Sequence, residues 1–170
     1  MTSTAGPRIR PATAADVGEI AAIYRHHVEH GVATFDLDAP GEAFWVAKLA
    51  DLTGAGLPFL VAEDAAGVVG FAYAGPWRVK RAYRQTVEDT IYLAPDRTGR
   101  GIGRLLLGAL LDAARAAGVR QVIAVITDSG DPSSMRLHEA FGFVEVGRLR
   151  AVGCKHGRWL DTLLLQADLT

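Results

Sequence analysis

The sequence predicts an α/β protein in which helices flank a mixed, mostly antiparallel sheet. Its 170 residues have the length of one ordinary domain and suffice to bury a sizeable core. Apolar residues make up 49% of the chain and charged residues 22%, which is typical of a globular protein. Strand and helix patterns follow in the order βααβββαβαββ, which predicts a helix-and-sheet sandwich. We therefore expect a single domain over residues 1–170.

The N-terminal part is expected to form one strand and two helices. Residues 1–7 read as a flexible tail, and residues 8–10 as a short first strand. Thr13 fits the N-cap of a helix that ends near His30. Apolar residues then recur at helical spacing, namely Val17, Ile20, Ala21, Ile23, Tyr24 and Val28. Residues 41–52 form the second predicted helix.

Strands dominate the centre of the chain. Residues 59–63 and 68–74 flank the turn residues 64–67, which predicts a β-hairpin. Residues 77–84 form a basic, aromatic loop or short helix. Residues 87–93 follow as another strand.

Helices and strands alternate in the second half. Residues 103–117 have an amphipathic helical pattern. Residues 121–126 are continuously apolar, which predicts a strand that is buried on both faces. A further helix is expected over residues 131–142, followed by strands at 143–150 and 159–169.

The composition excludes several classes of protein. Eighteen basic and nineteen acidic side chains give a formal charge of −1, which excludes a strongly basic nucleic-acid binder. One cysteine, Cys154, excludes a disulfide framework and a multi-cysteine zinc site, and fits a reducing cytoplasm. The longest apolar runs are too short to span a bilayer, and residues 1–10 contain no apolar signal segment. We expect a cytoplasmic protein without membrane or nucleic-acid partners.

The stretch from Asp96 to Arg104 is the most informative motif. It lies between a predicted strand and a predicted helix. Its glycines are Gly99, Gly101 and Gly103, and Arg100 and Arg104 add positive charge. Glycines allow a close backbone approach, and the N–H groups at a helix N-terminus attract phosphate oxygens. The stretch matches neither a Walker A loop nor a dinucleotide fingerprint. The alternative is a glycine-rich turn that only opens a helix.

Residues 93–107 resemble the acetyl-CoA loop of the GNAT superfamily of N-acetyltransferases, whose pattern is Gln/Arg-x-x-Gly-x-Gly/Ala. Gly101 and Gly103 match its glycines, whereas Thr98 stands at the Gln/Arg position. Residues 131–143 resemble the family's Asn-x-x-Ser-x-x-Leu-Tyr-x-x-x-Gly-Phe motif, with Asp131 in place of Asn. The resemblance implies acetyl-CoA as co-substrate, direct transfer in a ternary complex, a homodimer, and the GNAT fold with splayed central strands.

The implied acetyl-CoA site includes residues from both motifs and from the preceding strand. They are Ile91, Tyr92, Leu93, Thr98, Gly99, Arg100, Gly101, Ile102, Gly103, Arg104, Asp131 and Ser134.

Residues 72–77, 88–92 and 153–161 look like the branch of phosphinothricin and methionine sulfoximine N-acetyltransferases. The last of these segments contains a specific Gly-x-Lys-x-Gly-x-Trp-x-Asp run. The resemblance covers residues 8–168. It implies acetylation of the α-amino group of a small amino acid analogue such as phosphinothricin, methionine sulfoximine or methionine sulfone. The alternatives are acetylation of protein termini, lysines or polyamines, and a non-catalytic acyl-CoA sensor.

Acetyl transfer requires a neutral amine, and an α-amino group is mostly protonated at pH 7, so a general base is expected. Successive strand residues face opposite sides, which places Glu88 with Thr90 and Tyr92, away from Asp89. This parity favours Glu88 as the base unless a bulge shifts it. The resemblance also places the family's catalytic Glu at Glu88. The alternative is a solvated surface carboxylate.

His138 is the second catalytic candidate. It follows the second motif on a predicted helix, at a position where many GNAT enzymes have a Tyr that protonates the leaving thiolate. The branch with the phosphinothricin enzymes has His there, which implies a role as acid or base. An imidazole titrates near neutral pH and suits either role. The alternative is a structural histidine.

A basic, aromatic cluster and a loop aromatic are candidates for substrate binding. Arginine presents a bidentate fork to a carboxylate or phosphinate. The candidate residues are Trp77, Arg78, Lys80, Arg81, Tyr83 and Phe35. A solvated loop is the alternative interpretation of the basic cluster.

We expect no metal site and no covalent acyl-enzyme. His26 and His30 lie four residues apart on one helix, but the sequence shows no evident third ligand. Cys154 has a neighbouring lysine but is expected to be inert, because the family that the chain resembles uses direct transfer.

Overall fold

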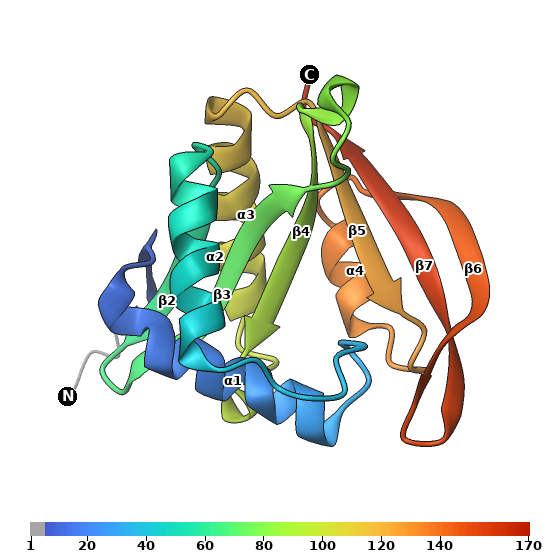
Figure 1. The fold of residues 1–170 in the computed structure, drawn as a ribbon, viewed down its shortest axis with the longest axis horizontal. Coiled ribbons are helices and arrows are strands. Elements are labelled where there is room, and N and C mark those ends of the chain that lie inside the picture. The colour runs from blue at the N-terminus through green and yellow to red at the C-terminus, as the bar shows by residue number, and fades with distance from the viewer. Residues whose placement is uncertain (1–5) are drawn as a thin grey trace.

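The computed structural model describes residues 6–170, so most of the predicted tail at residues 1–7 lies outside the described residues. Within these described residues, a seven-stranded sheet has the order β1-β2-β3-β4-β5-β7-β6, and only the β4–β5 pair is parallel (Figure 1). The strands are β1 (Arg8–Pro11), β2 (Phe59–Asp64), β3 (Gly67–Pro76), β4 (Thr86–Leu93), β5 (Gln121–Thr127), β6 (Val144–Lys155) and β7 (Arg158–Asp168). The prediction of a mixed, mostly antiparallel sheet is confirmed.

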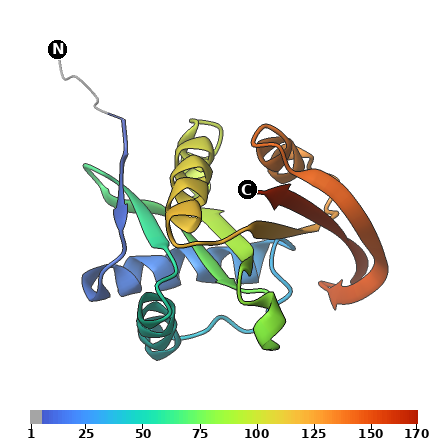
Figure 2. The same cartoon turned by 90° about the horizontal axis from the view of Figure 1, so that it is seen from above.

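Helices cover both faces of this sheet, as Figure 2 shows from above. The helices are α1 (Val17–His30), α2 (Glu42–Gly54), α3 (Ile102–Ala116) and α4 (Ser133–Glu139). The predicted order of elements is confirmed. Within residues 6–170 the structure contains no helix with the length and apolar character needed to cross a membrane.

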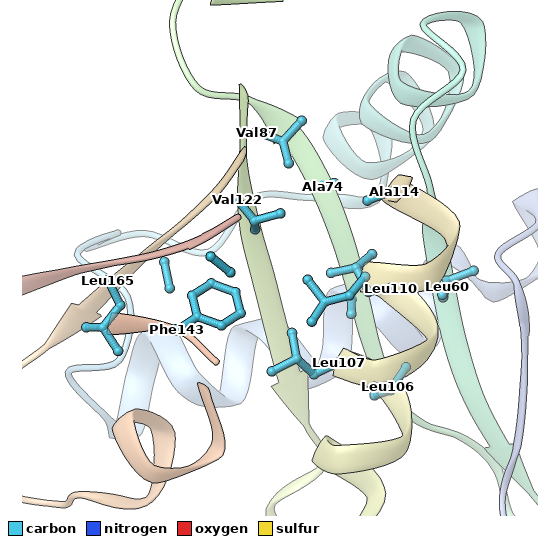
Figure 3. Packing of buried hydrophobic residues seen from close by; sticks show 14 of the residues in the cluster. Leu60, Ala74, Val87, Leu106, Leu107, Leu110, Ala114, Val122, Phe143 and Leu165 are labelled. Carbon is cyan, nitrogen blue, oxygen red and sulfur yellow. The ribbon is translucent and has the colours of Figure 1, made fainter. Parts of the chain in front are cut away.

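Each face of the sheet has its own hydrophobic core. On the α1–α2 face, the fully buried Trp45 packs edge-on against Tyr24 and Phe71, with ring centroids 5.1 and 5.4 Å apart. On the other face, the apolar stripe of α3 packs over β2, β3 and β4, and Val87 of β4 and Val122 of β5 belong to the same core (Figure 3). Burying apolar side chains of this size stabilises the fold by about 1.5–3 kcal/mol each. The two cores fix the helices on opposite sides of β4.

The parallel strands β4 and β5 separate after a short paired stretch. Only Thr86, Val87 and Glu88 of β4 have partners on β5, whereas β4 continues to pair with β3 as far as Leu93. Figure 1 shows the two strands side by side at one end and apart at the other. The prediction of splayed central strands is therefore confirmed. The edge of β4 beyond Glu88 has backbone groups that no strand within residues 6–170 covers.

Two details of the predicted strands are wrong. Residues 121–126 were expected to be buried on both faces, but the side chain of Val125 is 37% exposed because the divergence of β4 and β5 leaves one side of β5 uncovered. The strand expected over residues 143–150 continues to Lys155 as β6. A register shift between Leu149 and Gly153, with Ala151 at φ 48°, lets the chain bend and resume pairing.

Candidate active site

A pocket of about 760 Å³ opens where β4 and β5 diverge. Its wall is built from the free part of β4, the facing part of β5, the loop after α1, the glycine-rich turn with the first turn of α3, and α4 with the turn before it. A volume of this size is in the range of sites that enclose a small molecule.

The glycine-rich turn presents backbone donors to this pocket. Gly101 is the N-cap of α3 and has a φ of 77°, in the left-handed region that favours glycine. The first helical hydrogen bond runs from the N–H of Leu105 to the carbonyl of Gly101 at 3.2 Å, so the N–H groups of residues 102–104 have no helical acceptor. Free donors at the N-terminus of a 15-residue helix attract phosphate oxygens. The site thus fits the pyrophosphate of acetyl-CoA.

Most of the predicted acetyl-CoA residues come together in the pocket. Those that line it are Ile91, Tyr92, Leu93, Thr98, Gly99, Gly101, Ile102, Gly103, Arg104, Asp131 and Ser134. Arg100 is exposed and is not among the lining residues. The role of these residues in binding the co-substrate stays a prediction.

Asp131 takes the position at which the family pattern has Asn. Its Oδ1 accepts a hydrogen bond from the N–H of Ser133 at 2.9 Å. Hydrogen bonds from Ser133 hold the pKa of the Asp131 carboxyl below its ordinary value, so this carboxylate is ionised near neutral pH.

Glu88 is the last residue of β4 that pairs with β5, and its half-buried side chain lines the pocket. Burial raises the pKa of Glu88, and the charge of Asp89 raises it further, whereas Lys48 and Arg78 act in the opposite direction. A carboxylate with a raised pKa is a stronger base. The position and the pKa of Glu88 both suit the removal of a proton from an ammonium group.

The strand parity that separates Glu88 from Asp89 is confirmed. The β3–β4 register runs without a shift from Val87 to Leu93, so no bulge intervenes. Tyr92, on the Glu88 side of the strand, packs edge-on against Tyr24 of α1, whereas Asp89 points to His138 of α4.

His138 and Asp89 form a buried pair beside the pocket. The Nε2 of His138 lies 2.7 Å from Oδ2 of Asp89, and its Nδ1 lies 2.7 Å from the carbonyl oxygen of Ser134. Because both oxygens are acceptors, both ring nitrogens donate. Burial opposes the charged imidazole, but the hydrogen bond and the charge of Asp89 outweigh it and raise the pKa of His138. The predicted role of His138 in proton transfer stays a prediction, and the geometry describes an imidazolium held inside the protein.

The predicted substrate residues divide into two groups. Phe35 lines the pocket, on the loop after α1. The basic, aromatic residues lie on the connection between β3 and β4, outside the pocket lining: Trp77, Arg78, Lys80, Arg81 and Tyr83. The guanidinium of Arg78 lies 4.8 Å from the centre of the Trp77 ring, and its charge lowers the pKa of Glu88. This connection lies at the Glu88 end of β4, opposite the glycine-rich turn.

Sequence reasoning missed several residues of the pocket wall. Tyr24, His27, Thr34, Tyr73 and Thr162 line it as well. The Nε2 of His27 donates to the carbonyl of Leu93 at 2.7 Å, and burial lowers the pKa of this histidine, so the ring is neutral. The helical spacing of Tyr24 and His27 was a signal that they share one side of α1, but it did not show what that side contacts.

Comparison with known proteins agrees with this geometry. The sequence model of the Acetyltransferase (GNAT) family matches residues 19–143. A phosphinothricin N-acetyltransferase of Alcaligenes faecalis is 46% identical over 154 residues, which are 91% of this chain and 78% of that protein. An L-methionine sulfoximine/L-methionine sulfone acetyltransferase of Pseudomonas aeruginosa is 40% identical over 165 residues, covering 95% of this chain and 94% of that protein.

A solved structure agrees as well. The crystal structure of a GNAT superfamily phosphinothricin acetyltransferase from Sinorhizobium meliloti, in complex with acetyl-CoA, superimposes with a TM-score of 0.92 at 46% identity. The match covers 96% of this chain and 89% of that chain. The chain therefore belongs to the GNAT family of acetyltransferases, and acetyl-CoA is its co-substrate.

Proposed function

We propose that this enzyme acetylates the α-amino group of a small amino acid analogue of the phosphinothricin or methionine sulfoximine/sulfone type. One domain over residues 1–170 performs the transfer. The observation that carries the proposal is the position of Glu88, a half-buried base at the point where β4 and β5 part. The relatives named for phosphinothricin and for methionine sulfoximine and sulfone support this class of acceptor.

Two parts of the pocket hold acetyl-CoA. The N–H groups of residues 102–104 and the side chain of Arg104 bind its phosphates. The uncovered edge of β4 beyond Glu88 offers backbone hydrogen bonds to its extended arm, as a sheet edge does to an added strand. The acetyl thioester then lies beside Glu88.

Glu88 accepts a proton from the substrate ammonium, directly or through a water molecule. The neutral amine attacks the thioester carbon, the new C–N bond forms, and the C–S bond breaks with its electron pair leaving on sulfur. The nitrogen loses its second proton, which the leaving thiolate takes up, so the products are the neutral N-acetyl compound and CoA. The imidazolium of His138, held by Asp89, lies on the α4 side of the same pocket, where its charge favours the negative charge that develops on the thioester oxygen and on sulfur.

The acidic end of the acceptor faces the β3–β4 connection. Arg78, Lys80 and Arg81 give this end of the pocket a positive potential and attract a carboxylate or phosphinate. Trp77 and Tyr83 flank these cations, and Phe35 bounds the acceptor from the opposite loop.

The enzyme acts as a homodimer in the cytoplasm. β6 is an edge strand, and apolar side chains on β6 and at the start of β7 are exposed: Val144, Val146, Leu149, Val152 and Trp159. An exposed apolar edge strand favours association with a second copy. The free, exposed thiol of Cys154 fits a reducing compartment.

The test is acetyl-CoA consumption with a panel of acceptors. The panel contains phosphinothricin, methionine sulfoximine, methionine sulfone, the standard amino acids, a polyamine and a peptide with a free N-terminus. We expect turnover with phosphinothricin, methionine sulfoximine or methionine sulfone. Preference for the polyamine or the peptide would contradict the proposed acceptor class, and binding of acetyl-CoA without turnover on any amine would indicate an acyl-CoA sensor.

A further inference from the structure

The loop that follows α1 is tied down by a ring of hydrogen bonds. The hydroxyl of Tyr24 lies 2.5 Å from Oδ2 of Asp36 and 2.6 Å from Oγ1 of Thr34. The N–H of Asp36 donates to the same Oγ1 at 3.2 Å. Since the carboxylate accepts, Tyr24 donates to Asp36 and the Thr34 hydroxyl donates to Tyr24. Such a closed network strengthens each of its bonds and fixes the backbone on both sides of Phe35.

A buried lysine holds the same loop from the other half of the protein. Lys155, the last residue of β6, is 2% exposed, and its Nζ donates to the carbonyl of Thr34 at 2.8 Å. Burial lowers the pKa of this amine, and the charge of Asp36 opposes that shift. Removing an amine from water is unfavourable, and one hydrogen bond to a carbonyl offsets little of it. The position of Lys155 therefore calls for a role beyond filling space.

Gly153 receives the ring of Phe35. A Cβ atom on Gly153 would overlap the Phe35 ring, so only glycine admits the ring in this place. Gly153 and Lys155 are two residues apart on β6, and such residues face the same side of a strand. They thus contact the loop at adjacent positions, Lys155 at Thr34 and Gly153 at Phe35, and Thr34 and Phe35 both line the pocket.

We propose that Lys155 and Gly153 are positioning residues that fix Phe35 as the wall of the acceptor pocket and thereby set which acceptor side chains fit. This inference rests on the proposed function, in which Phe35 bounds the acceptor. The strand β6 lies beyond β7 at the edge of the sheet, so the specificity of the pocket depends on a strand that does not itself border the gap between β4 and β5. The Gly-x-Lys segment of the motif over residues 153–161 thereby acquires a physical role.

A double-mutant cycle tests the role of Gly153. Gly153→Ala displaces the Phe35 ring and is expected to raise the acceptor KM by roughly tenfold, with a smaller change in kcat and no change in the acetyl-CoA KM. In a Phe35→Ala background the ring is absent, so the same substitution should add no further effect. The matched control is Gly147→Ala on the same strand, because a Cβ there meets Leu164 at an ordinary 3.8 Å. Equal effects of Gly153→Ala in the two backgrounds would overturn the proposal.

Hydrogen exchange tests the role of Lys155 without any substrate. Lys155→Met keeps an unbranched side chain, one atom shorter, and removes the donor. We expect amide exchange across residues 31–37 to become roughly tenfold faster while exchange in α3 is unchanged. Unchanged exchange in this loop would overturn the role of Lys155. If Lys155→Met does not fold, the Gly153 double-mutant cycle still tests whether β6 positions Phe35. A wild-type enzyme that acetylates none of the proposed acceptors would contradict the proposed function, whereas the exchange measurement would still test the positioning of the loop.

Discussion

The imidazole of His138 and the carboxylate of Asp89 face each other across 2.7 Å, and each side chain is at most 3% exposed. The two residues are 49 positions apart and come from α4 and from the part of β4 that β5 no longer covers. The pair therefore connects β4 and α4, two walls of the pocket. It lies just beyond Glu88, where the backbone pairing of β4 with β5 ends. It also places a protonated ring in the wall of the pocket.

Asp89→Asn tests whether this pair holds the pocket together. The substitution keeps the size and removes the charge, and we expect the free energy of unfolding to fall by about 2 kcal/mol, because a buried imidazolium loses its counter-charge. Denaturant unfolding at neutral pH measures the difference. Asp112→Asn is the matched control, since its ion pair with Arg115 is largely exposed and should matter little. Equal stability of the two variants would show that the Asp89–His138 pair is not an ion pair.

The raised pKa of His138 predicts a definite dependence of stability on pH. A group whose pKa is higher in the folded state stabilises the fold fully below its unfolded pKa of about 6.5, and this contribution disappears as the pH rises through the folded pKa. The difference in melting temperature between wild type and His138→Gln should therefore be largest under mildly acidic conditions and shrink as the medium becomes alkaline. A difference that grows with pH would mean that the ring is neutral in the folded enzyme.

Much of this arrangement could be predicted from the sequence. The parity of residues 87–93 placed Glu88 and Asp89 on opposite faces, and the unbroken β3–β4 register confirms it. The partner of Asp89 could not be predicted, because strand periodicity gives a face but not the residue of a distant helix that meets it. The exposure of Val125 escaped prediction for a related reason: an apolar run indicates burial, whereas the gap beside β5 arises only from the divergence of two strands.

Lys155 is a second residue whose distant contacts could not be predicted from the sequence. A lysine next to a hairpin turn is expected at the surface, and its burial depends on a loop 121 residues away. The Gly-x-Lys-x-Gly run marked the segment as specific, yet the sequence offered no physical reason for it. In the structure, Lys155 and Gly153 contact the loop after α1 at Thr34 and Phe35.

Gly101→Ala tests the phosphate site. A Cβ at this position meets no atom within 4 Å, so the substitution acts through the backbone, whose φ of 77° costs a non-glycine residue about 1–2 kcal/mol. We expect the turn to shift and the affinity for acetyl-CoA to fall by about tenfold, measured by calorimetry. Gly41→Ala is the control, because its surroundings are equally open and its φ is an ordinary −78°. Unchanged affinity in a folded Gly101→Ala enzyme would exclude this turn from the acetyl-CoA site.

Arg78→Gln tests the capture of an anionic acceptor. We expect the acceptor KM to rise by about tenfold with little change in kcat, since the contact with the carboxylate is the same in the ground and transition states. The matched control is Arg84→Gln, which removes an exposed arginine from the same connection without removing a charge that acts on Glu88. Equal KM values for the two variants would contradict the assignment of Arg78.

The most direct test of the mechanism is the single-turnover rate of acetyl transfer in Glu88→Gln. The substitution keeps the size of the side chain and removes its basicity, so we expect the rate to fall roughly a hundredfold or more, with acetyl-CoA affinity unchanged. In the wild type, the rate should fall at acid pH as Glu88, whose pKa is raised, becomes protonated. This acid limb of the pH–rate profile should be absent in Glu88→Gln. The control is Glu145→Gln, on the exposed part of β6, which should react at the wild-type rate. A Glu88→Gln enzyme that transfers acetyl at the wild-type rate, while Asp89→Asn does not, would contradict the account and move the base to the Asp89–His138 pair.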